Sequence, residues 1–126
     1  MGESDTLEKW RGQIRKGFLE LCVLAMVDRL GETYGLDLQE RLSAHDLEVA
    51  EGTLYPLLTR MTKEGSLAAT WNMPLRGHPR KYYRLEERGR ELLAVMRVEY
   101  RAAFDSWQAI ENVTGIPQEA ESEESV

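Results

Sequence analysis

Apolar residues recur at the spacing of an α-helix along three segments in the first half of the chain. The first segment, residues 10–30, carries one apolar face with a second row of aliphatic residues beside it, which predicts a helix buried on two sides. Gly31, Tyr34 and Gly35 interrupt this pattern, and leucines at 36, 38 and 42 resume it in a second, short helix. The residues from His45 and Asp46 onward are predicted to form the turn into a third helix.

The third segment reads EGTLYPLLTRMTKEG over residues 51–65. Its apolar residues share one helical face and are Leu54, Leu57, Leu58 and Met61. A proline is tolerated in the first turn of a helix, where backbone N–H groups have no partner to lose, so Pro56 predicts a start between residues 50 and 53. Thr53 is the candidate N-cap if the helix starts late, and Gly65 is the predicted stop.

The second half of the chain begins with two segments that have the residue pattern of β-strands. Residues 67–71 and 80–85 are rich in aromatic residues and flank the turn MPLRGHP, which predicts a β-hairpin with one of Tyr82 and Tyr83 facing inward. A long helix over residues 86–113 follows. The predicted fold is therefore mostly α with a small β-hairpin, in the element order of a winged helix-turn-helix plus a long C-terminal helix. In that architecture the third helix enters the DNA major groove and the hairpin is the wing.

The length and composition of the chain are those of a single domain. The 126 residues are 42% hydrophobic, no stretch approaches the ~18 apolar residues that span a bilayer, and the N-terminus lacks a hydrophobic signal region. Cys22 is the only cysteine, which excludes an intramolecular disulfide and favours a cytoplasmic protein. We expect a mobile N-terminus at 1–9, a winged helix-turn-helix at 10–85, a dimerisation helix at 86–113 and an acidic disordered tail at 114–126.

The formal charge of −6 conceals two basic regions. Five of the 22 acidic residues lie between Glu111 and the C-terminus, so residues 1–110 hold seventeen acidic and sixteen basic residues. Residues 9–16 contain four cations and no acid, and residues 76–90 contain six cations opposed by Glu86 and Glu87 alone. Composition by itself allows scattered cations on solvated helix faces equally well. The clustering keeps nucleic acid among the candidate partners.

Two motifs in this order resemble the PadR family of bacterial transcriptional regulators. They are GTLYP at residues 52–56, which opens the third helix, and PRKYYRL at residues 79–85, on the second hairpin strand. The similarity extends over about residues 10–110. Ser66 stands where the family usually has an aliphatic residue, which leaves packing at the base of the wing open, and Glu86 replaces a threonine cap. The resemblance implies a dimeric DNA-binding regulator.

If the apolar face of the third helix packs onto the first two, its opposite face meets the major groove. Hydroxyl groups there can reach phosphates or base edges, Pro56 suits a thymine methyl group, and Arg60 can bind either guanine or phosphate. Wing cations suit the DNA backbone or a narrow minor groove. The predicted DNA surface consists of Arg15, Lys16, Thr53, Tyr55, Pro56, Thr59, Arg60, Lys63, Arg76, His78, Arg80 and Lys81. The alternative is an ordinary solvated helix face.

The last helix carries an a/d seam that predicts a homodimer. The seam consists of Leu93, Met96, Tyr100, Ala103, Trp107 and Ile110. It could instead fold back onto its own chain, but in PadR-like proteins this helix pairs with its counterpart and with the partner's first helix. Two recognition helices about 34 Å apart would require a near-palindromic operator. Four residues could also line a pocket for a small aromatic or hydrophobic effector, as the resemblance implies: Met96, Tyr100, Phe104 and Trp107.

An enzyme is not expected. His45, His78 and Cys22 are the only histidines and cysteine, and they have no metal-ligand spacing, so neither a metal nor another cofactor is predicted. No glycine-rich phosphate loop occurs. We expect a repressor rather than an activator, because a compact dimer without an activation region acts by blocking polymerase. The alternative from another class is a protein-interaction module that keeps the winged-helix fold and does not bind DNA.

Overall fold

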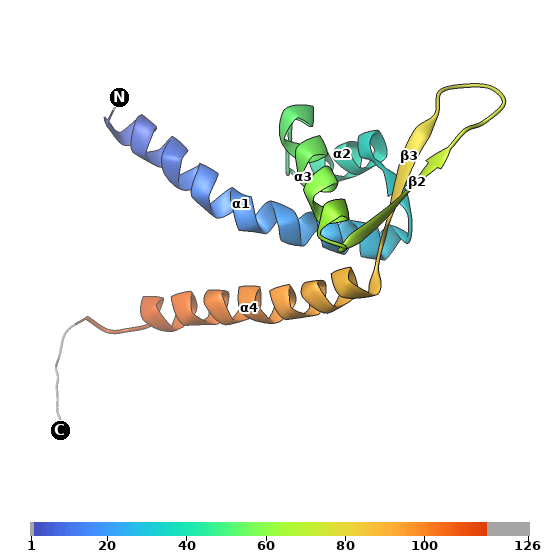
Figure 1. The fold of residues 1–126 in the computed structure, drawn as a ribbon. Coiled ribbons are helices and arrows are strands. Elements are labelled where there is room, and N and C mark those ends of the chain that lie inside the picture. Colours follow the sequence, from blue (N-terminus) through green and yellow to red (C-terminus); the bar gives the residue numbers. More distant parts are fainter. Residues whose placement is uncertain (1, 116–126) are drawn as a thin grey trace. The chain divides into compact units, whose positions relative to one another are not determined.

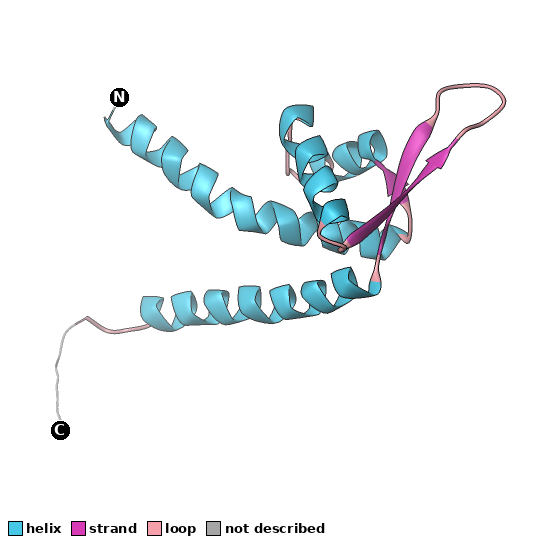
Figure 2. Ribbon diagram, viewed as in Figure 1, coloured by secondary structure: helices cyan, strands magenta, loops and turns pink. Residues whose placement is uncertain are grey.

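The computed structural model of the protein describes residues 2–115 and contains four helices and three strands in that range (Figures 1 and 2). The elements are α1 (Gly2–Leu30), β1 (Thr33–Tyr34), α2 (Gly35–Ser43), α3 (Glu51–Lys63), β2 (Leu67–Asn72), β3 (Arg80–Leu85) and α4 (Glu87–Glu111). The predicted winged-helix order and the mostly helical fold class are confirmed. The predicted acidic tail lies mainly at residues 116–126, outside the described residues.

The first helix is longer than the hydrophobic pattern indicates. It begins at Gly2, whereas the sequence predicts a start near Trp10 after a separate N-terminal segment, so the predicted boundary is wrong. No proline interrupts residues 2–9, and Asp5 lies near the helix N-terminus, where a negative charge is favourable. An ion pair of 3.5 Å between Glu8 and Arg11 also links one turn to the next. These features favour a helix at residues 2–9, but the spacing of apolar residues does not reveal them.

The sheet contains a strand that the sequence does not reveal. Its order is β1-β3-β2, and both pairs are antiparallel. Residues 33 and 34 form the two-residue strand β1 by pairing with Tyr83 and Tyr82 of β3. A strand of two residues is too short to show alternation, and its partner lies about fifty positions away in the chain. The predicted inward tyrosine is Tyr83, which is buried, whereas Tyr82 packs edge-on against Tyr34 with ring centroids 5.3 Å apart.

The hydrophobic core joins all four helices to the sheet. Its buried side chains are Leu19, Val23, Leu24, Val27, Leu38, Leu42, Leu54, Leu58, Met61, Leu67, Tyr83, Leu85 and Leu93. Cys22 is half-buried and packs against this core, and burial raises the pKa of its thiol. A raised pKa keeps the thiol protonated, so Cys22 serves as a small apolar residue beside the core.

The junction between α3, β2 and α4 depends on a close backbone approach. Gly65, with φ of 85°, ends α3 in the left-handed region as predicted. The next residue, Ser66, is buried, and its carbonyl accepts a hydrogen bond from the Glu86 N–H at 3.0 Å. A Cβ at Gly89 would lie 2.1 Å from that carbonyl oxygen. At the base of the wing, a buried serine and a glycine therefore approach each other closely beside the aliphatic side chain of Leu85.

The chain divides into two compact units between Met96 and Arg97. The first unit contains the winged helix and the first ten residues of α4. Within the second unit, the described residues are the remainder of α4 and the short segment that follows it. Phe104 and Trp107 contact each other there, with ring centroids 5.6 Å apart.

Candidate nucleic-acid interface

The outward face of α3 has the composition that the sequence predicts. Leu54, Leu58 and Met61 are buried. Because a helix repeats every 3.6 residues, burying these positions turns the remaining ones to the surface. The exposed residues on the opposite face are Thr53, Tyr55, Pro56, Thr59, Arg60 and Lys63. Hydroxyl groups, a tyrosine and two cations thus share one face.

The start of α3 falls within the predicted range, but Pro56 lies further along the helix than expected. The helix begins at Glu51 after the N-cap Ala50, so Pro56 is its sixth residue and lies beyond the first turn. Proline lacks the N–H that would bond to the carbonyl of Gly52, and the helix accommodates this loss close to its end. The cap also differs from expectation: Ala50 offers no side-chain hydrogen bond, and Thr53 lies inside the helix.

Arg60 is held by two carboxylates. Its Nη2 donates a hydrogen bond to Oε2 of Glu20 on α1 at 2.6 Å, and its Nη1 donates to Oε1 of Glu64 at 3.0 Å. The hydrogen bond with Glu64 is the main cause that raises the pKa of Arg60. Binding to a phosphate or a base would have to replace these contacts. Arg60 therefore connects α3 to α1, a role that its position on the exposed face does not reveal.

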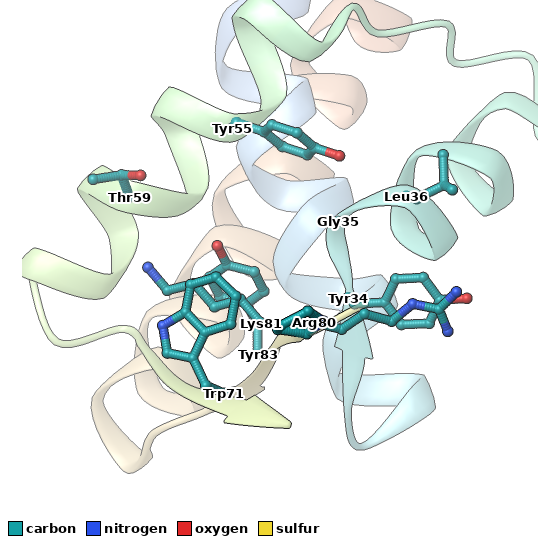
Figure 3. A pocket seen from close by; sticks show the side chains of 10 residues that line it. Tyr34, Gly35, Leu36, Tyr55, Thr59, Trp71, Arg80, Lys81 and Tyr83 are labelled. Atoms are coloured by element: carbon teal, nitrogen blue, oxygen red, sulfur yellow. The ribbon is translucent and has the colours of Figure 1, made fainter. Parts of the chain in front are cut away.

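A groove lies between α3, the start of α2 and the strands of the wing (Figure 3). It has a volume of about 410 Å³ and is lined by Tyr34, Gly35, Leu36, Tyr55, Thr59, Trp71, Pro79, Arg80, Lys81 and Tyr83. Two predicted residues of the helix, Tyr55 and Thr59, therefore meet two predicted residues of the wing, Arg80 and Lys81, whereas the other predicted residues of α3 and of the wing do not line this groove. Aromatic rings form much of the wall, and two cations line it.

Tyr55 owes its place in this groove to Gly35. A Cβ at Gly35 would lie 2.5 Å from Cε1 of the Tyr55 ring, so a larger residue would displace the ring from its position beside α2. Tyr55 stays 39% exposed. Burial is the main cause that raises the pKa of Tyr83, and the neighbouring Tyr55 adds to it. A raised pKa keeps the Tyr83 hydroxyl protonated and able to donate a hydrogen bond.

The wing cations are ordered by aromatic rings and by the sheet. The Arg80 guanidinium lies 4.3 Å from the centroid of the Tyr34 ring, and the Lys81 ammonium lies 5.9 Å from that of Tyr83. Lys81 is half-buried and pairs across the sheet with Trp71. Arg76 and His78 are exposed in the loop between β2 and β3. Of these residues, Arg80 and Lys81 line the groove that α3 borders.

A second groove brings the predicted cations of α1 to the start of α3. It has a volume of about 330 Å³ and is lined by Gly12, Arg15, Lys16, Leu19, Leu47, Glu48, Val49, Ala50 and Thr53. Arg15 and Lys16 are exposed, and the helix N-terminus beside them also carries a partial positive charge. The structure thus joins Thr53 to the cations of α1, which the sequence predicts only separately.

The predicted DNA surface missed six residues that line the groove at the wing: Tyr34, Gly35, Leu36, Trp71, Pro79 and Tyr83. Trp71 could have been found by strand alternation once the register was known, because it lies opposite Lys81. Tyr34 carries no such signal, since β1 exists only through its pairing with β3. The Asp37 carboxylate supports this corner: it accepts a hydrogen bond from the Thr33 hydroxyl at 2.7 Å, which is the main cause that lowers the pKa of Asp37.

The predicted dimer seam is only partly on the surface. Leu93 is 1% exposed and belongs to the core of its own chain, so its assignment to the interface is wrong. The reason is that the start of α4 closes the base of the wing, and Met96 is also partly buried there. The remaining seam residues are exposed: Tyr100, Ala103, Trp107 and Ile110. The Phe104 and Trp107 rings that the sequence assigns to an effector pocket lie in contact.

Two other findings limit the chemistry of the described part of the chain. Among residues 2–115, no group of three or more His, Cys, Asp and Glu side chains could hold a metal ion. In the same range, no helix combines the length and the apolar character needed to cross a membrane.

Comparison with known proteins agrees with this geometry. Residues 23–95 match the Transcriptional regulator PadR-like family. A PadR-like transcription factor from Bacteroides fragilis is 33% identical, with 81% of this chain and 98% of that one covered and a TM-score of 0.71. A PadR family transcriptional regulator from Eggerthella lenta is 29% identical, with 91% of this chain and 96% of that one covered and a TM-score of 0.76. A PadR-like transcriptional regulator from Bacillus cereus is 32% identical, with 80% of this chain and 98% of that one covered and a TM-score of 0.70. No curated protein matches the chain.

The family match spans more than half of the chain, and the relatives share its fold. The chain belongs to the PadR-like family of transcriptional regulators.

Proposed function

We propose that the protein is a homodimeric, sequence-specific DNA-binding regulator that represses transcription from a near-palindromic operator. The observation that carries this proposal is the groove in which the exposed face of α3 meets the cationic strands of the wing. A recognition helix in the major groove leaves the adjacent phosphate backbone beside its flank. The cations and hydroxyl groups of this groove lie on that flank.

Phosphate contacts would come from both sides of α3. Arg80 and Lys81 border the groove on the wing side, and Arg15 and Lys16 border the second groove on the α1 side. Each phosphate that a cation neutralises releases counterions, so affinity should fall steeply with salt. Base readout would rest on Thr53, Tyr55, Pro56 and Thr59, and Lys63 at the C-terminal end of the same face would contact a phosphate. Arg60 stays at the edge of this surface, where its two ion pairs favour a bracing role.

Dimerisation would use the exposed apolar residues of α4 beyond Met96. An exposed apolar stripe of this length marks an interaction surface, and a second copy supplies a matching one by two-fold symmetry. Two α3 helices one DNA turn apart would then read the two halves of the operator. A small aromatic or hydrophobic effector that binds near Tyr100, Phe104 and Trp107 would couple ligand to DNA release. Such a compound should quench tryptophan fluorescence in the wild-type protein. Loss of this quenching in Trp107→Ala would support effector binding at these residues.

The test is a salt series of binding affinities on a duplex that the wild-type protein selects from a random-sequence library. Tyr55→Ala should weaken binding by about tenfold, because it removes a ring and a hydroxyl from the groove. Lys63→Gln should reduce the slope of log affinity against log salt by about 1, since one phosphate contact is lost. The fold of each variant is checked by circular dichroism.

Arg29→Gln serves as the matched control, because Arg29 is exposed but lies outside both grooves. It should leave affinity and salt slope unchanged. Failure of the wild-type protein to enrich any duplex would contradict DNA binding and favour the protein-interaction module instead.

A further inference from the structure

The loop that joins β2 to β3 carries two apolar side chains at its exposed end. Leu75 is fully exposed (105%) and Met73 is 69% exposed, although both belong to residue types that proteins usually shield from water. In Figure 1 this loop projects away from the helices of the first unit. Gly77, with φ of 92°, adopts a left-handed conformation that lets the loop turn back toward β3. The loop thus presents Leu75 outward and leaves it uncovered by the described part of its own chain.

The charges around Leu75 indicate what covers it. From residue 65 to residue 85 the chain contains no acid but four arginine and lysine residues, and Arg76 and His78 are the close neighbours of Leu75. A surface of this charge attracts a polyanion. Arg80 and Lys81, at the end of β3 that adjoins this loop, line the groove that α3 borders. The tip of the wing and α3 are therefore placed to meet one ligand, which is DNA if the proposed function holds.

We propose that Leu75 is a minor-groove wedge, an inference that rests on the proposed function and extends it. With α3 in the major groove, the hairpin reaches the neighbouring minor groove. Arg76 and His78 then lie against the phosphates and the groove edges, and Leu75 enters between two base pairs. Apolar side chains that enter there partly unstack the step and kink the duplex by about 20–90°. Met73 provides additional apolar surface beside the wedge.

A wedge contributes sequence preference without a hydrogen bond to a base. Pyrimidine–purine steps such as TA and CA unstack at the lowest cost, so the operator should carry such a step where the wing tip lies. The positions read by Leu75 would flank those read by α3. Leu75 is therefore a specificity-determining residue that acts through DNA deformability.

The experiment compares wild type, Leu75→Ala and Leu75→Met on a duplex that the wild-type protein selects from a random-sequence library. Energy transfer between dyes at the two duplex ends reports bending, and 2-aminopurine placed step by step reports unstacking. Leu75→Ala should bind about tenfold more weakly and lose both the bend and the 2-aminopurine signal, with its salt slope unchanged. Leu75→Met keeps an apolar side chain and should retain the bend. Because Leu75 is exposed, none of these variants should lose thermal stability.

Arg76→Gln is the contrast within the same loop. It should reduce the salt slope by about 1 and leave the kinked step in place. A mismatch at the kinked step lowers the cost of unstacking, so it should strengthen binding of wild type more than binding of Leu75→Ala.

Two results would overturn the inference. If Leu75→Ala kept the DNA affinity and the DNA bend of the wild-type protein, the protein would bind DNA but Leu75 would not act as a wedge. A wild-type protein that binds no duplex but binds vesicles of anionic phospholipid through Leu75 would overturn the wedge and the proposed function together.

Discussion

The carbonyl oxygen of Ser66 occupies the place where a side chain at Gly89 would have to lie. Ser66 is buried and its carbonyl already accepts the Glu86 N–H, so this backbone has little freedom to move aside. Gly89 is therefore the residue that lets α4 start directly against the base of the wing. Gly35 has a related role beside Tyr55, but there the obstacle is a half-exposed ring that can rotate away.

Gly89→Ala should lower the free energy of unfolding by about 1–3 kcal/mol, the cost of forcing one extra methyl group into a packed site. The new Cβ would lie 2.1 Å from the Ser66 oxygen, a distance that requires α4 or the wing base to shift. Urea unfolding followed by circular dichroism measures the change.

Gly17→Ala is the control for helix propensity. Gly17 lies inside α1, and a Cβ added there would meet no packing neighbour within 4 Å, so alanine should stabilise the protein by about 0.5–1 kcal/mol. Equal effects of the two substitutions would contradict the steric account of Gly89.

At the scale of elements, α3 is fixed by its core face and by a contact at its flank. The core face consists of buried leucines and a methionine, and these set the rotation of the helix about its axis. Arg60 adds a bond to Glu20 on α1, forty positions earlier in the chain. The helix that presents the candidate DNA surface is thus tied to the helix that carries Arg15 and Lys16.

A double-mutant cycle of Arg60→Gln and Glu20→Gln should give a coupling energy of up to about 1 kcal/mol in unfolding experiments. The expected value is modest because both side chains are partly exposed and water screens the pair. The coupling should shrink as salt is added.

The pair Glu8 and Arg11 supplies a control cycle, because it is more exposed, longer at 3.5 Å and confined to one helix. Its coupling should be about 0.3 kcal/mol or less. If the cycle at Arg60 gave no coupling while Arg60→Gln weakened DNA binding and reduced its salt slope, Arg60 would be a DNA contact and not a brace.

At the scale of the whole molecule, the proposed homodimer depends on the second unit. Its described part is a helix with exposed aromatic and aliphatic residues, and a lone copy would leave these in water. A domain of this size gains stability from additional burial between copies. The proposed readout of a near-palindromic operator depends on the same association.

Sedimentation equilibrium should return a dimer for the wild-type protein, and Phe104→Ala combined with Trp107→Ala should shift it toward monomer. The two rings contact each other and are half-exposed, so their loss removes much of the apolar seam. Trp71→Ala removes an equally exposed tryptophan from the wing and should remain dimeric while binding DNA more weakly. A monomeric wild-type protein at micromolar concentration would contradict the proposed dimer.

Local patterns in the sequence determined which segments are helical, where the hairpin lies and which face of α3 is exposed. The 3.6-residue spacing of residues 54–61 encodes burial of one face, and the motif around Pro79 marks a strand. These features depend on residues within a few positions of one another, so they can be predicted from the sequence without the folded structure.

Tertiary structure alone decided which surfaces cover one another. The strand β1 exists because β3 pairs with it, the carboxylate of Glu20 meets Arg60 because α1 passes beside α3, and Leu93 enters its own core because Gly89 admits α4. Periodicity reports that a side chain is buried or exposed but not which distant segment buries it. The groove that carries the proposed function is a product of such long-range contacts, since its residues come from β1, α2, α3 and the wing.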